Sequence, residues 1–140
     1  MTGKVFFDTN IFVCANHRPE PRKLSITLDL IRDATIDSTA VISYQVIQEF
    51  FNAVLSKSRR KMAYEEATLF LETIFRLLPT VPSSVALMGE AIRIQERYRL
   101  SWYDSLIVSA AQQAGCHTLY SEDLQHGQQF GPVTVKDPFR

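Results

Sequence analysis

Four acidic side chains stand where a chain alternating between strands and helices would place catalytic or metal-binding groups. Each lies within two residues of the end of an expected strand or in the first turn of an expected helix: Asp8, Glu49, Asp104 and Asp123. In open parallel sheets, ligands bind outside the carboxyl ends of the strands. We therefore expect at least the first, second and fourth of these acids to meet at one edge of a sheet, and the third is compatible with the same place.

Carboxylates brought together in this way would repel one another. Two unit charges 4 Å apart cost about 4 kcal/mol at an effective dielectric constant near 20. No Lys or Arg is adjacent in sequence to any of the four acids. A divalent cation would offset the repulsion, and oxygen ligands without His or Cys favour Mg²⁺ or Mn²⁺ over zinc.

Each acid also has a purely structural interpretation. Glu49 and Asp104 could favour the positive end of a helix dipole, and Asp123 could be a turn residue. Asp8 is harder to explain in this way, because Asp is depleted in strands and a buried carboxylate is costly unless it is paired.

The elements expected to carry these acids alternate along the chain. Strands are expected at 5–7, 40–43 and 118–121, with weaker candidates at 80–81 and 133–135. Helices are expected at 24–31, 47–55, 64–78, 85–99 and 103–114, from apolar residues spaced three or four apart. This alternation predicts an α/β fold with a largely parallel sheet in one domain spanning 1–140. The patterns 64–78 and 85–99, separated by a segment that contains Pro79 and Pro82, predict a helical hairpin or a cap added to the sheet.

Composition and charge restrict the class of protein. The 140 residues contain 15 Lys and Arg and 15 Asp and Glu, so bulk charge argues against nucleic-acid binding. The two cysteines show no C-x-x-C spacing, and the longest apolar helical stretch, 106–111, is far shorter than the ~20 residues of a membrane span. The start of the sequence does not resemble a signal peptide. We therefore expect a cytoplasmic protein without a membrane partner.

Four segments together resemble a known family. They are Phe6–Asn10 (Phe-Phe-Asp-Thr-Asn), Gln48–Phe50, Trp102–Ile107 and Leu119–Asp123. In this order they are similar to the acidic motifs of PIN-domain ribonucleases, and above all to the toxins of bacterial VapBC toxin–antitoxin pairs. The resemblance spans essentially the whole chain.

The resemblance implies a fold, a site and partners. The fold would be a PIN-like three-layer α/β structure, a small, mostly parallel sheet flanked by helices, with a helical-hairpin clip. Asp8, Glu49, Asp104 and Asp123 would be catalytic and bind one or two Mg²⁺ or Mn²⁺ ions, with Thr9, Asn10 and Ser121 in support. The implied activity is endonucleolytic cleavage of RNA, and the implied partners are an antitoxin and a second copy of the chain.

The fourth motif departs from the family pattern. Many relatives have another Asp or Asn two residues after its acid, followed by Phe, whereas Leu124 and Gln125 follow Asp123 here. Glu122 is adjacent, but Asp123 occupies the matching position.

Local basic clusters could bind RNA despite the zero net charge. The main candidates are Lys57, Arg59, Arg60 and Lys61, which could equally form a solvated helix end. Further candidates are Arg93, Arg97 and Arg99, and also Arg18, Arg22 and Lys23 in an expected Pro-rich loop. Assigning four of the 15 acids to a metal site leaves 11 acidic groups against 15 basic ones.

The sequence is also compatible with other functions to different degrees. A haloacid-dehalogenase-type phosphatase would need a second acid where Asn10 stands, and a receiver-type signalling domain would need paired acids early in the chain. A housekeeping RNA-processing nuclease and an inactive PIN-like binding module also fit the sequence.

Overall fold

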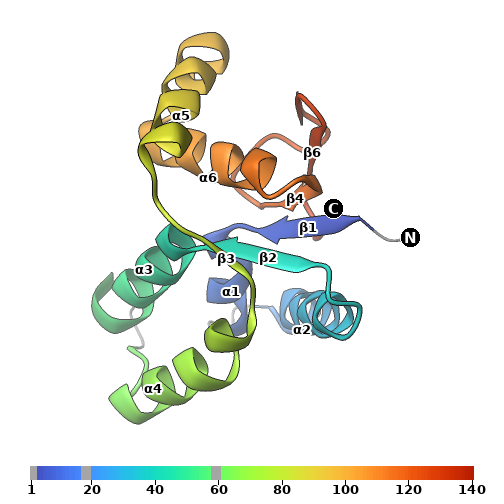
Figure 1. The fold of residues 1–140 in the computed structure, drawn as a ribbon. Coiled ribbons are helices and arrows are strands. Elements are labelled where there is room, and N and C mark those ends of the chain that lie inside the picture. Colours follow the sequence, from blue (N-terminus) through green and yellow to red (C-terminus); the bar gives the residue numbers. More distant parts are fainter. Residues whose placement is uncertain (1–2, 17–19, 58–60) are drawn as a thin grey trace.

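The computed structural model describes residues 3–16, 20–57 and 61–140, and its centre is one six-stranded sheet (Figure 1). The strands lie in the order β3-β2-β1-β4-β6-β5. Neighbouring strands are parallel, except that β5 runs antiparallel to β6. Their bounds are β1 (Lys4–Phe7), β2 (Ala40–Ser43), β3 (Thr80–Val81), β4 (Cys116–Tyr120), β5 (Gln129–Phe130) and β6 (Val133–Lys136).

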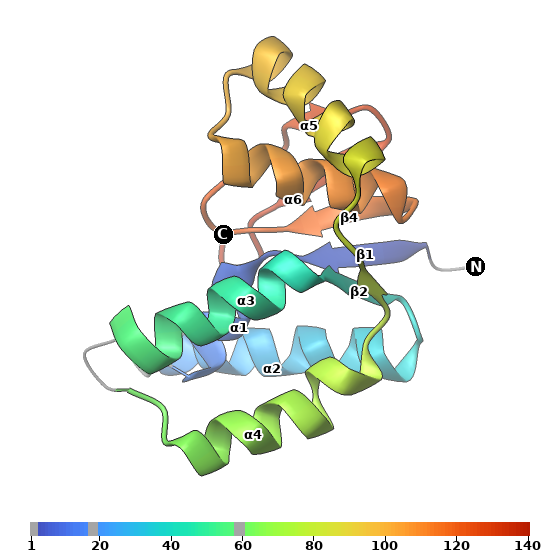
Figure 2. The ribbon, with the colours of Figure 1, turned by 60° about the vertical axis from the view of Figure 1, so that its left-hand side comes forward.

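Helices cover both faces of the sheet. Figures 1 and 2 show α5 and α6 on one face and α1 to α4 on the other, so the molecule has three layers. The helices are α1 (Thr9–Asn16), α2 (Pro21–Ile36), α3 (Tyr44–Asn52), α4 (Tyr64–Thr73), α5 (Val85–Tyr98) and α6 (Trp102–Gln113). A π-helical turn, Ala53–Lys57, extends α3, and a 3₁₀ turn, Phe75–Leu77, follows α4. The predicted three-layer α/β fold with a mostly parallel sheet is confirmed.

Burial of the central strands in the core explains why their sequences are uninterrupted apolar runs. Phe6, Phe7, Ile42 and Leu119 are fully buried, as expected for parallel strands covered on both faces. On the face of the sheet covered by α1 to α4, aromatic rings pack between the helices: Phe50 of α3 stacks on Phe70 of α4, with 4.7 Å between the ring centroids. This rigid core fixes the strand ends that carry the acidic residues.

The predicted pairing of 64–78 with 85–99 is wrong. The short strand β3 lies between the two helices and pairs with Ile42 and Ser43 of β2, so the chain passes the edge of the sheet. As a result α4 packs on α3, whereas α5 packs on α6 on the opposite face, where Ser109 donates a hydrogen bond to the carbonyl of Leu87 (2.8 Å). The two helices that pack together on the face covered by α1 to α4 are therefore α3 and α4.

The segment after β1 also differs from the expected Pro-rich loop. Thr9–Asn16 forms α1, whose β-branched and polar residues gave no clear helical pattern. Arg22 and Lys23 lie in the first turn of α2, where Pro21 occupies a position that suits its fixed φ. Arg18 lies outside the described residues. Across the described part of the chain, no helix has the length and apolar character that a membrane crossing would need.

Candidate functional site

All four acids of the sequence motifs line one pocket of about 310 Å³ beyond the carboxyl ends of the central strands. Asp8 follows β1, Asp123 lies in the loop after β4, Glu49 is on α3, and Asp104 is in the first turn of α6. The described residues that complete the lining are Thr9, Asn10, Val13, Asn52, Ala53 and Lys57. The tertiary structure thus brings together side chains separated by more than 100 positions.

Glu49 reaches this pocket from a different helical position than predicted. The helix α3 begins at Tyr44, directly after β2, because the Ser43 hydroxyl caps it by accepting a hydrogen bond from the Val46 amide (3.4 Å). Glu49 therefore lies in the second turn of α3, and the prediction of a first-turn position is wrong. A carboxylate this far from the first turn has little helix-dipole benefit, which weakens the purely structural interpretation of Glu49.

Asp8 is the most buried of the four, with 5% of its surface exposed. Its Oδ1 accepts a hydrogen bond from the Thr9 amide (2.7 Å). Its Oδ2 accepts hydrogen bonds from the Ser121 hydroxyl (2.9 Å) and the Asn10 side-chain amide (3.2 Å). Neutral donors therefore satisfy this carboxylate, with no cation among its described hydrogen-bond partners.

Ser121 and Asn10 connect the first and fourth acids. The Ser121 hydroxyl oxygen accepts the backbone amides of Asp123 (3.2 Å) and Leu124 (3.3 Å) while its proton points to Asp8. Asn10 Nδ2 also donates to Asp123 Oδ2 (3.2 Å), and its Oδ1 accepts the backbone amide of Glu122 (3.0 Å). These bonds fix the loop after β4 against the start of α1.

Other hydrogen bonds hold Glu49 and the backbone of Asp104, and Thr9 takes part in both groups, since its amide donates to Asp8. Glu49 Oε1 accepts hydrogen bonds from Thr9 Oγ1 (3.2 Å) and from Gln45 Nε2 (3.1 Å). The backbone amide of Asp104 donates to the Ser101 hydroxyl, which caps α6 (3.1 Å). Gln45 contacts Glu49 but was missed by sequence reasoning, because it precedes the helix expected at 47–55; with α3 beginning at Tyr44, it lies at i, i+4 spacing from Glu49.

The electrostatics of the pocket disfavour negative charge. Burial raises the pKa of Asp8 to about 7, with further increases from the charges of Asp104 and Asp123, against the lowering effect of the hydrogen bonds from Ser121 and Thr9. Burial, followed by the charge of Asp123, also raises the pKa of Asp104. A bound cation would stabilise this site, because it brings together carboxyl groups whose pKa values are raised.

The donor set fits a hard divalent cation. The pocket offers carboxylate oxygens, with hydroxyl and amide oxygens nearby and neither His nor Cys among its described lining residues. Within the described ranges, no three His, Cys, Asp or Glu side chains are close enough together to enclose an ion as they stand. The acids thus share a pocket, and the Asn10 amide lies between the carboxylates of Asp8 and Asp123.

Glu122 points away from this pocket. Its carboxylate forms an ion pair with Lys23 of α2, and Glu122 does not line the pocket, whereas Asp123 does. The geometry therefore favours Asp123 over Glu122 as the fourth acid.

The expected basic cluster reaches the pocket at one described position. Lys57, at the end of the π-helical turn, lines the pocket beside the acids. Lys61 is exposed, and Arg59 and Arg60 lie outside the described residues.

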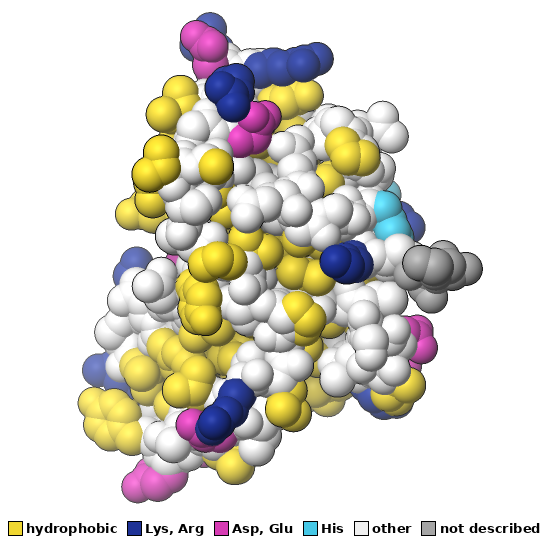
Figure 3. Space-filling view, viewed as in Figure 1, with side chains coloured by type: hydrophobic (Ala, Val, Ile, Leu, Met, Phe, Trp, Pro, Cys, Tyr) yellow, Lys and Arg dark blue, Asp and Glu magenta, His cyan; other side chains and the backbone are white. Residues whose placement is uncertain are grey.

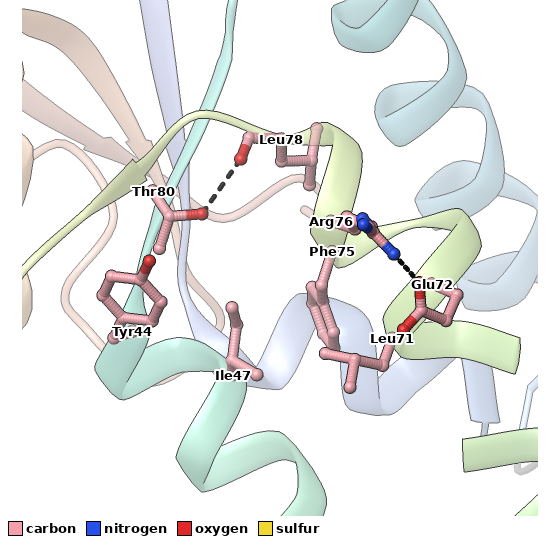
Figure 4. A pocket seen from close by; sticks show the side chains of 8 residues that line it. All are labelled: Tyr44, Ile47, Leu71, Glu72, Phe75, Arg76, Leu78 and Thr80. Carbon is pink, nitrogen blue, oxygen red and sulfur yellow. Dashed lines mark hydrogen bonds and ion pairs between the residues drawn. The ribbon is translucent and has the colours of Figure 1, made fainter. Parts of the chain in front are cut away.

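A second, larger depression of about 470 Å³ lies on the α3–α4 side of the molecule. Figure 4 shows Tyr44 and Ile47 of α3 facing Leu71, Phe75 and Leu78, with the Arg76–Glu72 ion pair at its margin. In Figure 3 hydrophobic side chains gather over this region. We call it the α3–α4 groove, and it contains none of the four motif acids.

Comparison with solved structures finds the same fold in bacterial toxin–antitoxin assemblies. A chain of the DNA-bound VapBC complex from Salmonella typhimurium has a TM-score of 0.72 at 15% identity, over 98% of this chain and 99% of that one. A chain of VapBC2 from Rickettsia felis, bound to a promoter DNA fragment, has a TM-score of 0.64 at 21% identity, over 94% and 96%. VapC20 from Mycobacterium tuberculosis, a toxin that cleaves the sarcin–ricin loop, has a TM-score of 0.63 at 17% identity, over 86% and 90%.

Sequence comparison identifies the family directly. A search of curated proteins finds no match to this sequence. The family model of the PIN domain matches residues 5–128, which include all four acids of the pocket. Since that match covers most of the chain and agrees with the fold, the chain belongs to the PIN-domain family.

Proposed function

We propose that this protein is an endoribonuclease dependent on Mg²⁺ or Mn²⁺, and that it is the toxin of a type II toxin–antitoxin pair. The observation that carries the proposal is the shared pocket of Asp8, Glu49, Asp104 and Asp123, in which burial and mutual repulsion raise the pKa of Asp8 and of Asp104. Membership of the PIN-domain family supports a nuclease, and the VapBC assemblies with the same fold support the toxin role.

In this mechanism the protein side chains would hold the ions and orient one another, and none of them would form a covalent bond to the substrate. The four carboxylates would bind one or two ions, which supply a more acidic bound water and stabilise charge on the attacking and leaving oxygens. Ser121 and Asn10 orient Asp8 and Asp123, and Thr9 orients Glu49. Lys57 would contact a phosphate of the substrate at the margin of the acids.

RNA is the proposed substrate. VapC20 from Mycobacterium tuberculosis, which shares the fold, cleaves the sarcin–ricin loop. We extend only the substrate class to this chain, with Lys57, Arg59, Arg60 and Lys61 as the phosphate-binding cluster. A cluster of this kind binds through phosphates and therefore carries no sequence information of its own.

An antitoxin is the proposed protein partner, and the α3–α4 groove supports its docking. The groove is open and has both apolar and polar lining residues, and Tyr44 and Leu71 on its walls are 52% and 39% exposed. An apolar segment of an antitoxin encoded next to this chain would cover it. Leu71→Asp should then weaken the purified complex in a titration, and an unchanged affinity would place the antitoxin elsewhere.

A homodimer is proposed as well, through the outer face of α5. Val85, Met88 and Ile92 follow i, i+3, i+7 spacing on α5 and are 88%, 42% and 59% exposed, so they form one apolar stripe on its surface. Ile92→Asp should convert a dimer to a monomer in light scattering. A wild-type protein that remains monomeric at high concentration would remove this proposal.

The nuclease proposal is tested by RNA cleavage with and without chelation. Wild-type protein should cut RNA with added MgCl₂ or MnCl₂ and lose cleavage in EDTA. Asp8→Asn and Asp104→Asn should each reduce cleavage at least 100-fold while retaining cooperative unfolding, because each removes a charged ligand. Asp37→Asn, an exposed acid at the end of α2, is the matched control and should retain full activity. Cleavage that persists in EDTA, or in both site variants, would overturn the proposal.

A further inference from the structure

Gln45, a residue outside the sequence motifs, does not line the acidic pocket but hydrogen-bonds Glu49, which does. Gln45 lies in the first turn of α3, one helical turn before Glu49. Its Nε2 donates to Glu49 Oε1 (3.1 Å) and to the backbone carbonyl of Tyr103 (3.1 Å). The primary amide has two N–H donors, which matches these two acceptors.

The two acceptors belong to elements that the chain builds separately. Glu49 is on α3, which follows β2, whereas Tyr103 is in the first turn of α6, on the other face of the sheet. Tyr103 immediately precedes Asp104. The Gln45 amide therefore connects the helix that carries one acid to the backbone that carries another.

The contact also determines which oxygen of Glu49 is available. Oε1 accepts from both Gln45 and Thr9, two donors from different helices. Among the hydrogen bonds of the described residues, Oε2 has no protein donor. With Oε1 fixed from two sides, the carboxylate plane is set, and Oε2 is the oxygen left for a ligand in the pocket that Glu49 lines.

We propose that Gln45 is a positioning residue of the metal site, which orients the Glu49 carboxylate and fixes its spacing from Asp104. This inference rests on the proposed function and deepens it, since it concerns how the same four acids are arranged. Groups that orient metal ligands by hydrogen bonds commonly change metal affinity or activity by 10- to 100-fold when they are removed. Because Thr9 would still hold Oε1, we expect the lower end of that range for Gln45.

The test is a Mn²⁺ titration of Gln45→Met, which keeps the length of the side chain and removes its donors. The Mn²⁺ concentration for half-maximal RNA cleavage should rise about tenfold, and cleavage at saturating Mn²⁺ should return to within a few-fold of wild type. Calorimetric titration of the protein alone with Mn²⁺ should show the same shift in affinity. Gln45→Glu should be weaker still, since it places an anion against Glu49.

A matched control separates positioning from general damage to the helix. Gln48 is on the same helix, is exposed, and makes no side-chain hydrogen bond within the described residues. Gln48→Met should titrate like wild type. A Gln45→Met protein with the Mn²⁺ affinity of wild type would overturn this inference and leave the nuclease proposal standing. Wild-type protein that neither binds Mn²⁺ nor uses it in cleavage would overturn both.

Discussion

The side-chain amide nitrogen of Asn10 lies 3.2 Å from a carboxylate oxygen of Asp123, across 113 positions of sequence. The same nitrogen lies 3.2 Å from Oδ2 of Asp8. A neutral donor therefore stands between two anions that would otherwise repel each other directly. This amide holds the start of α1 against the loop after β4; a proposed metal ligand, Asp8, immediately precedes α1, and another, Asp123, lies in that loop.

Substitution of Asn10 should impair the site through this bridge. Asn10→Ala removes the donor, and the Mn²⁺ concentration needed for half-maximal cleavage should rise 10- to 100-fold. Asn10→Asp adds a third anion and should also lower the unfolding temperature in EDTA, because like charges in a low-dielectric site repel strongly. Asn16→Ala, at the far end of the same helix, is the control. An Asn10→Ala protein with normal metal dependence would show that the bridge is dispensable.

The fourth acid can be identified by comparing two adjacent carboxylates. Asp123→Asn should reduce cleavage at least tenfold, because Asp123 lines the pocket. Glu122→Gln should leave cleavage close to wild type and cost at most about 1 kcal/mol of stability, since its ion pair with Lys23 is partly exposed. Single-turnover cleavage and urea unfolding measure the two effects. The reverse ranking of the two variants in cleavage would assign the fourth position to Glu122.

Asp8 should make the stability of the metal-free protein depend on pH. Its pKa is about 7 in the folded protein, against 3.8 for the ordinary side chain. At pH values between these two, the Asp8 carboxyl group keeps its proton in the folded state and loses it in the unfolded state. The free energy of unfolding should therefore fall as pH rises from about 4 to 7, by an amount on the order of a few kcal/mol from this group.

Asp8→Asn isolates that contribution. In EDTA the variant should match wild type near pH 4 and be more stable than wild type at pH 7.5, as measured by urea unfolding at both values. Other titrating groups largely cancel in the difference between the two proteins. A stability difference that is the same at both pH values would show that Asp8 titrates normally.

The basic cluster should contribute to RNA affinity through phosphates. Replacing Lys57, Arg59, Arg60 and Lys61 together by Ala should weaken binding of a non-cleavable RNA in EDTA. The slope of log affinity against log salt should decrease by about 0.7 for each phosphate that the variant no longer neutralises. Arg32→Ala, in an exposed ion-pair cluster on α2, is the control. Unchanged affinity together with an unchanged salt slope would remove the cluster from the binding surface.

Local patterns in the sequence determined the fold class and the placement of the acids along the chain. Buried parallel strands appear as short apolar runs, so an Asp directly after Phe7 is conspicuous. The longer amphipathic helices show their period in the spacing of apolar residues, whereas the eight-residue α1 does not. Even the weak candidate strands at 80–81 and 133–135 are present as β3 and β6. Patterns of this kind can be recognised in the sequence without knowing which segments become neighbours in the fold.

Only the tertiary structure decided which residues meet. The order β2-β1-β4 places Asp8 beside the loop of Asp123, and the pairing of β3 with β2 sends α4 and α5 to opposite faces. The bridge from Gln45 to Tyr103 and the high pKa of Asp8 follow from those placements. Contacts between distant segments and the desolvation of a carboxylate depend on strand order and packing, and the spacing of residues along the chain does not contain that information.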